Sequence, residues 1–177
     1  MPTSRPAYLH VGAYNQSASG FFTLDERLAT VRESAGLTLP LAPRAIFMPE
    51  YPLVNTTVLS LFSFTEAYIR ERFLAVFRTC NQKKDFLFAD SGSNEGAWSM
   101  LAAAHGCRVA AIDPQPLCIQ LLDAAATRSG FSIELHNRIL APPQSNHTMM
   151  VPVDQCHGTS QYQPQTQRVS DVTAPGR

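Results

Sequence analysis

The amino-acid sequence predicts an α/β fold with a parallel sheet covered by helices. Short apolar runs alternate with helix-length segments between residues 85 and 136, and each helix-length segment is followed by a glycine, Gly106 or Gly130. Alternation of this kind is typical of parallel sheets, and glycine commonly follows a helix end. We expect strands at residues 86–89, 109–112 and 131–135, and helices at about 94–105 and 117–129.

Three further elements are expected before this core. Residues 23–36 have capping-box spacing at Thr23 and Glu26, which predicts a short amphipathic helix. Residues 37–53 contain four prolines, which favour extended chain over helix. Residues 65–80 carry apolar side chains at helical spacing, so a longer helix should lead into the first strand.

The composition is that of an ordinary soluble domain. The chain has 177 residues, is 45% hydrophobic, and carries 14 basic and 14 acidic side chains. A balanced charge provides no general attraction for nucleic acid or an anionic membrane, so neither is expected as a partner. No segment reaches the roughly 18 apolar residues of a membrane span.

The cysteines and histidines show no metal-binding pattern. The four cysteines lie far apart without a Cys-x-x-Cys pair, and the five histidines have no ligand spacing. We therefore expect buried free thiols and no metal. The N-terminus has no continuous apolar h-region of a signal peptide, so we expect a cytoplasmic protein. Glycosylation sequons at Asn15, Asn55 and Asn146 leave open an N-terminal anchor upstream.

The loop after the first strand of the core, residues 90–96, is the candidate binding site. In open α/β sheets, ligands bind outside the carboxyl ends of the strands, commonly against this loop. Gly92 and Gly96 allow a sharp turn and a close approach of the backbone to a ligand. Asp113 ends the next strand, at about the offset from which an acid reaches ribose hydroxyls.

The glycine spacing distinguishes between ribose-containing ligands. A pyrophosphate site favours Gly-x-Gly-x-x-Gly, whereas this loop is Gly-x-x-x-Gly and carries Asp90 and Glu95, which repel phosphate. NAD is therefore disfavoured. A cofactor with an ammonium group and a sulfonium, such as S-adenosylmethionine, suits an acid-bearing loop better.

The stretch "DSGSNEGAWSMLAAAHGCRVAAIDPQP" resembles motif I and the second-strand acid of S-adenosylmethionine-dependent methyltransferases of the FkbM type. The residues that carry the resemblance are Asn94, Gly96, Ser99, Asp113 and Pro114. Two residues depart from the family's usual form, because Ser91 replaces an aliphatic residue and Glu95 stands where an apolar residue is common. The resemblance implies a Rossmann-like sheet of the class I methyltransferase type.

The resemblance also implies which residues bind the cofactor. The residues implied along its methionine and ribose part are Asp90, Gly92, Ser93, Asn94 and Gly96. Asp113 is implied for the ribose hydroxyls and Asn137 for the neighbourhood of the adenine, while Glu66 falls in the preceding helix where the family often carries a glutamate. Asn137 and Glu66 also suit ordinary turn and helix-capping roles.

Family members continue with further strands, including an Ile-Lys-x-Asp-x-Glu-Gly segment that is not found here. The sheet is thus expected to stop after its third or fourth strand. We divide the chain into an N-terminal helix and Pro-rich wrap at residues 1–64, a cofactor-binding region at 65–153 and a polar, disordered tail at 154–177.

The leading hypothesis is an S-adenosylmethionine-dependent methyltransferase acting on an oxygen atom of a small molecule or glycan-type acceptor. No general base is identified in the sequence. The alternatives are a truncated, catalytically inactive methyltransferase fragment and an NAD-type nucleotide-binding protein. The methyl acceptor and the oligomeric state stay open.

Overall fold

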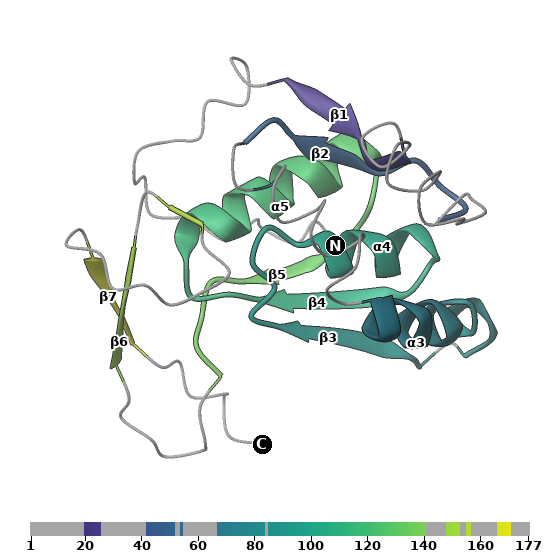
Figure 1. The fold of residues 1–177 in the computed structure, drawn as a ribbon. Helices are drawn as coiled ribbons and strands as arrows, with labels where there is room; N and C mark the ends of the chain where they lie inside the picture. The colour runs from purple at the N-terminus through teal and green to yellow at the C-terminus, as the bar shows by residue number, and fades with distance from the viewer. Residues whose placement is uncertain are drawn as a thin grey trace, which may run out of the picture.

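The structure, a computed structural model, describes residues 20–25, 42–51, 54, 67–83, 85–140, 148–152, 155–156 and 166–170. These residues contain one three-stranded sheet and two two-stranded sheets. The three-stranded sheet is the centre of the fold, and most of the described helices pack on it (Figure 1).

The central sheet is parallel and follows chain order. Its strands are β3 (Leu87–Ser91), β4 (Arg108–Ile112) and β5 (Glu134–His136), joined by helices α4 (Ala97–Ala104) and α5 (Pro116–Ser129). Leu87 pairs with Arg108, and Ala110 pairs with Glu134. The predicted α/β class is therefore confirmed, and the arrangement is compatible with a Rossmann-like fold.

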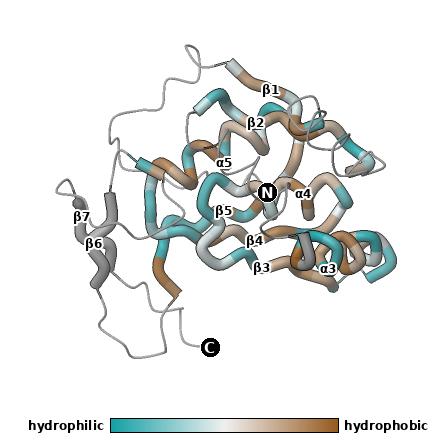
Figure 2. Tube along the Cα trace, in the orientation of Figure 1, coloured by the Kyte–Doolittle hydropathy of each residue, from teal (hydrophilic) through white to brown (hydrophobic). Residues whose placement is uncertain are grey.

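Small side chains allow α4 and α5 to lie close to the sheet and to each other. Every residue of α4 except Trp98 is buried, and the last three residues of the helix, 102–104, are alanines. Apolar residues predominate along α4 and β4, as the brown colour in Figure 2 shows. Burial of this surface supplies about 25 cal/mol for each Å² of apolar area removed from water.

Gly96 marks the closest approach between the two helices. It precedes α4 with φ of +84°, and a Cβ at this position would overlap the side chain of Leu122 in α5. Leu122 is fully buried and has little room to move. Glycine is thus needed here both for its backbone conformation and for the space it leaves.

Helix α3 (Ala67–Phe77) packs through an aromatic cluster and confirms the helix predicted around residues 65–80. The Phe73 ring lies 5.6 Å from Phe88 of β3 and 5.0 Å from Trp98 of α4, in edge-on geometry. Phe77, which is fully buried, lies 5.0 Å from Phe88. A 3-10 helix at Cys80–Gln82 then leads toward β3.

Two short strands from the N-terminal region lie on α5. β1 (Phe21–Thr23) and β2 (Phe47–Pro49) pair antiparallel, and β2 contacts α5. The backbone N–H of Phe47 donates to Ser129 Oγ at 2.9 Å, and the guanidinium of Arg128 lies over the Phe47 ring. The Pro-rich segment is extended there, as predicted.

The predicted helix at residues 23–36 is described only at its start. Thr23 ends β1, and Leu24 and Asp25 are helical. The remainder of that helix lies outside the described residues.

The C-terminal region departs from the sequence-based expectation. β6 (Thr148–Pro152) is the strand expected in "HTMMVPV", and it pairs antiparallel with β7 (Thr166–Ser170) rather than joining the central sheet. The prediction of disorder throughout residues 154–177 is therefore wrong at β7. Strand pairing uses backbone hydrogen bonds, so a largely polar segment can still form a ladder.

All four cysteines form disulfides, which corrects the prediction of free thiols. Cys80 bonds to Cys107, and Cys118 bonds to Cys156, at sequence separations of 27 and 38. The first bond joins the end of the α3 region to the start of β4, and the second joins the first turn of α5 to the C-terminal segment. The sequence spacing of the cysteines does not reveal which of them pair, because the partners become neighbours only in the folded chain.

We expect no free thiol in the chain produced in an oxidising compartment. Alkylation by iodoacetamide in denaturant should add no mass without reductant and four carbamidomethyl groups after reduction. Each double variant, Cys80→Ser/Cys107→Ser or Cys118→Ser/Cys156→Ser, should lower the free energy of unfolding by about 4 kcal/mol, because the unfolded chain gains loop entropy. Four alkylated cysteines before reduction would contradict the pairing.

Gly96→Ala should lower the free energy of unfolding by about 3 kcal/mol, since overpacking against Leu122 adds to the strain of a positive φ. Gly130→Ala is the matched control, because Gly130 also has positive φ but open space around its Cβ position. It should cost about 1 kcal/mol. Urea denaturation measures both values, and equal losses would show that the contact with Leu122 is unimportant.

Candidate functional site

The turn between β3 and α4 is fixed by its own backbone. Gly92 and Asn94 have φ of +72° and +52°, conformations that glycine and asparagine adopt most readily. The backbone N–H groups of Gly92 and Ser93 donate to the carbonyl of Ile112 at the end of β4. The turn therefore lies against the carboxyl ends of both strands, where the sequence predicted the site.

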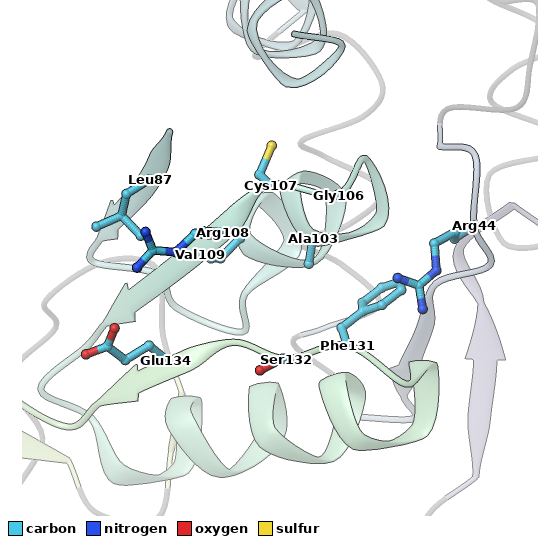
Figure 3. A pocket seen from close by; sticks show the side chains of 10 residues that line it. All are labelled: Arg44, Leu87, Ala103, Gly106, Cys107, Arg108, Val109, Phe131, Ser132 and Glu134. Carbon is cyan, nitrogen blue, oxygen red and sulfur yellow. The ribbon is translucent and has the colours of Figure 1, made fainter. Parts of the chain in front are cut away.

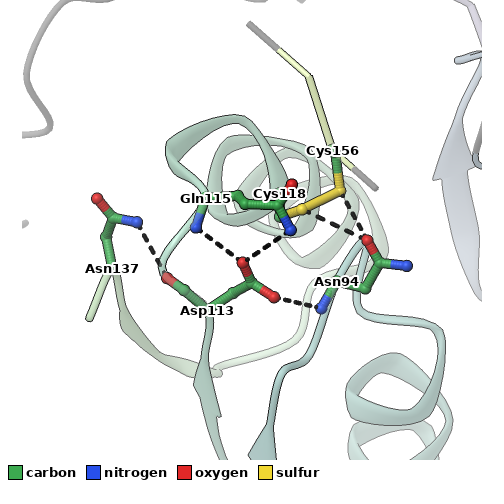
Figure 4. The surroundings of a disulfide bond; sticks show 6 residues. All are labelled: Asn94, Asp113, Gln115, Cys118, Asn137 and Cys156. Atoms are coloured by element: carbon green, nitrogen blue, oxygen red, sulfur yellow. Dashed lines mark hydrogen bonds between the residues drawn. A yellow bond between two sulfur atoms is a disulfide. The ribbon is translucent and has the colours of Figure 1, made fainter. Parts of the chain in front are cut away.

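Asp113 connects this turn to the start of α5. Its Oδ2 accepts a hydrogen bond from the backbone N–H of Asn94 at 2.8 Å, and its Oδ1 accepts one from the backbone N–H of Gln115 at 2.8 Å (Figure 4). Asp113 is 2% exposed. Gln115 Nε2 also donates to Oδ1, at 3.5 Å. A carboxylate has about four acceptor positions, so one remains after these three bonds.

Asp90 lies near the end of β3, and a hydrogen bond from α4 holds its side chain in place. Ser99 Oγ donates to Asp90 Oδ2 at 2.6 Å. The two residues that the resemblance placed in one motif are thus in direct contact. Ser99 is fully buried, so its hydroxyl is shielded from solvent and holds the Asp90 carboxylate in one orientation.

Asn137 also joins the site, and Glu66 cannot be placed. Asn137 follows β5, and its Nδ2 donates to the backbone carbonyl of Asp113 at 3.0 Å. That bond fixes the turn after β4 and gives Asn137 a structural role beside the predicted ribose site. Glu66 lies outside the described residues.

Most of the predicted site residues therefore lie together at the carboxyl end of the sheet. The loop after β3, Asp113 after β4 and Asn137 after β5 are joined by hydrogen bonds. The members brought together are Asp90, Gly92, Ser93, Asn94, Gly96, Asp113 and Asn137.

Three carboxyl groups are concentrated in this small volume. Burial is the largest cause that raises the pKa of Asp90, Glu95 and Asp113 above their ordinary values, and the pKa of Glu95 rises to about 7. Asp113 and Asp90 add charge repulsion to Glu95. The turn is therefore a region where a cation would be stabilised and a phosphate would be repelled.

Two buried polar atoms of the turn have no hydrogen-bond partner among the described residues. They are Ser93 Oγ and Glu95 Oε1, in residues that are 6% and 3% exposed. Glu95 was noticed in the sequence as a departure from the family and as an obstacle to phosphate, but not as a site residue. The sequence carries a signal for this role. Glu95 is a charged side chain directly before the glycine that starts a helix, at a position where an apolar residue is common.

The Cys118–Cys156 disulfide lies against the turn. Asn94 Oδ1 is 3.1 Å from Cys156 Sγ and 3.5 Å from Cys118 Sγ (Figure 4). Disulfide sulfurs carry no hydrogen, so these are contacts between the bond and the amide rather than donated hydrogen bonds. The disulfide holds the segment that contains Cys156 beside Asn94.

A separate hollow of about 420 Å³ lies at the opposite end of the sheet (Figure 3). Leu87, Arg108 and Glu134 line it from the amino ends of the three strands, and Arg44 and Phe131 close one side. The guanidinium of Arg44 lies 4.5 Å from the centre of the Phe131 ring. These groups are distant from the glycine turn, so this hollow is not the candidate cofactor site.

The described residues include no group of three or more histidine, cysteine or acidic side chains arranged to hold a metal ion. In the same part of the chain, no helix has the length and apolar character needed to cross a membrane.

No protein-family model, curated protein or solved structure matches this chain. The functional argument therefore rests on the residues and geometry of the turn.

The buried acid at Glu95 should make stability depend on pH. Its pKa is about 7 in the folded chain and about 4.5 when unfolded, so the folded state binds more protons between these values. The free energy of unfolding should accordingly fall by about 3 kcal/mol as the pH rises from 4.5 to 7. Asp90 and Asp113, whose pKa values are also raised, act in the same direction.

Glu95→Gln isolates this contribution, because glutamine stays neutral. Urea denaturation at pH 5 and pH 8 should show a smaller loss of stability in this variant than in the parent chain. Asp85→Asn, at an exposed carboxylate, is the matched control and should keep the parent's pH profile. Identical profiles for the parent and Glu95→Gln would show that Glu95 is not strained by burial.

Proposed function

We propose that this chain binds S-adenosylmethionine at the glycine turn and acts as a methyltransferase of the FkbM type. The observation that supports this most strongly is the cluster of carboxyl groups at the carboxyl end of a parallel sheet. Asp90 lies near the end of β3, Asp113 directly follows the neighbouring strand β4, and Glu95 lies in the loop between β3 and α4. A ligand that carries positive charge and a ribose suits this chemistry.

Asp113 is suited to the ribose hydroxyls. Both of its oxygens already accept a backbone N–H, which fixes the orientation of the carboxylate. One acceptor position is open for a ribose hydroxyl, and displacement of the Gln115 side-chain amide from Oδ1 would free a second position for the other hydroxyl. Because Asp113 is nearly fully buried, binding requires a local opening beside Asn94 or Gln115.

When held at the turn, the cofactor would supply an electrophilic methyl group on a sulfonium. A substrate hydroxyl oxygen would bond to the methyl carbon as the thioether S-adenosylhomocysteine leaves, and the hydroxyl proton would pass to solvent. The chain's part in such a reaction is to hold the reacting groups in line and to exclude water from them. The fixed turn at residues 92–96 and the Asp90–Ser99 bond contribute rigid positioning. The acceptor is proposed to be an oxygen atom of a small molecule or glycan.

The two disulfides favour an oxidising compartment for this protein. Disulfides persist in secreted proteins and in the lumen of the secretory pathway, whereas cytosolic thiols are kept reduced. We accordingly propose that the protein works in an oxidising compartment rather than in the cytoplasm that the sequence suggested. The sequons at Asn15, Asn55 and Asn146 lie outside the described residues.

Calorimetric titration with S-adenosylhomocysteine tests the proposal. We expect saturable micromolar binding by the parent chain, weakened about tenfold or more in Asp113→Asn, because an amide cannot accept hydrogen bonds from both backbone groups and both hydroxyls. Asp123→Asn in α5 is the matched control and should bind like the parent.

The other outcomes identify the alternatives. Binding of NADH in place of S-adenosylhomocysteine would favour a dinucleotide-binding protein. Absence of binding by a chain with a cooperative thermal transition would contradict the proposal and favour an inactive methyltransferase fragment.

A further inference from the structure

The hollow at the amino ends of the central strands has the size of a small-molecule site. Its volume of about 420 Å³ lies within the roughly 300–1,000 Å³ that such sites occupy. It lies at the end of the sheet opposite the glycine turn, so it is separate from the site proposed for the cofactor (Figure 3). A ligand of this hollow would be bound whether or not the turn holds S-adenosylmethionine.

Arg44 is fixed at one end of the hollow. Its guanidinium lies 4.5 Å from the centre of the Phe131 ring, and its Nη2 donates to the backbone carbonyl of Gly130 at 3.2 Å. A guanidinium has five N–H donors, so most of them remain after this bond. The ring contact and the hydrogen bond hold the plane of the group, which directs the remaining donors. An arginine held in this way loses little conformational entropy when it binds an anion.

Arg108 lies at the other end of the hollow (Figure 3). It is the first residue of β4 and is exposed. Among the residues that the structure describes, no acid forms an ion pair with its guanidinium. Glu134 of β5 lines the same end, but its Oε1 lies 2.9 Å from His136 Nε2. Glu134 is thus engaged by a neighbour on its own strand, and the donors of Arg108 are available to a ligand.

The floor of the hollow between the two arginines is apolar. Ala103, in the last turn of α4, and Val109 of β4 are 5% and 3% exposed, and Phe131 forms part of the wall. Contact with such a surface is favourable for methylene or aromatic groups and unfavourable for further charges. The hollow thus combines a cationic group at each end with an apolar middle.

We propose that this hollow binds a small dicarboxylate, with one carboxylate on Arg44, the other on Arg108, and the carbon chain over Ala103 and Val109. A guanidinium and a carboxylate match in a bidentate pair, so each end supplies charge-assisted hydrogen bonds. The two guanidiniums compensate the two charges of the ligand. Specificity comes from the fixed separation of the arginines, since an acid with a single carboxylate engages only one of them at a time.

A chain-length series tests the two-point arrangement. Calorimetric titration of the full disulfide-bonded chain with the linear dicarboxylates from succinate to sebacate should give one preferred length, because the ends of the site are fixed. The preferred acid should bind with a Kd of about 0.1–1 mM at low salt, where charge pairs are least screened. The monocarboxylate of equal length should bind about tenfold more weakly, because it leaves one guanidinium unpaired.

Arg44→Gln and Arg108→Gln separate the two ends of the site. Each variant should bind the preferred dicarboxylate about tenfold more weakly, which brings its affinity to that of the monocarboxylate in the parent chain. Binding of the monocarboxylate itself should fall about twofold or less in either variant, since the other arginine still holds its single group. Arg72→Gln, at an exposed arginine of α3, is the matched control and should change neither affinity.

Thermal unfolding of each variant accompanies the titrations, and Arg108→Gln decides the outcome if Arg44→Gln does not fold. Equal losses of monocarboxylate and dicarboxylate binding in the variants would overturn the proposal, because the defect would then be general. It is also overturned if all chain lengths bind alike, if the monocarboxylate binds as tightly as the best dicarboxylate, or if the folded parent chain binds none of these acids. No outcome bears on the proposed function, since S-adenosylhomocysteine takes no part in these titrations.

Discussion

The carboxylate of Asp113 holds together the end of the sheet on which the rest of the site depends. It accepts one backbone N–H from the turn after β3 and another from the start of α5, while its own carbonyl accepts Asn137. The carboxylate thus fixes the connections that follow β3 and β4, and the backbone carbonyl of the same residue fixes the connection that follows β5. A buried carboxylate is stable in such a place only when it is well hydrogen-bonded, which explains why these donors converge on it.

The same arrangement creates a conflict among the acids. Asp90 and Asp113 are stabilised by hydrogen bonds, whereas the buried Glu95 Oε1 has no hydrogen-bond partner in the part of the chain that the structure describes, and burial raises the pKa of Glu95 to about 7. The fold therefore tolerates a local destabilisation at the turn, a situation that is frequent where a protein binds its ligand. The tight packing of Gly96 against Leu122 keeps the strained turn in position.

The sequence predicted the regular core well and the long-range connections poorly. Glycines at positions 106 and 130 and apolar runs located the helices and strands to within a few residues, because these signals are local. The position of Asp113 at the carboxyl end of the second strand, beside the glycine turn, was also predicted from the sequence. Pairing of Cys80 with Cys107 and of β6 with β7 depends on how distant segments fold together, which no local pattern records.

The two disulfides also determine how the chain would transmit a mechanical force. A pull on the two ends passes through each sulfur–sulfur bond and bypasses the residues that the bond encloses, namely 81–106 and 119–155. Between Cys80 and Cys156, tension would therefore act on residues 107–118 alone. That stretch contains β4 and Asp113, so extension of this protein would load the central strand and the site's anchoring carboxylate while sparing the glycine turn.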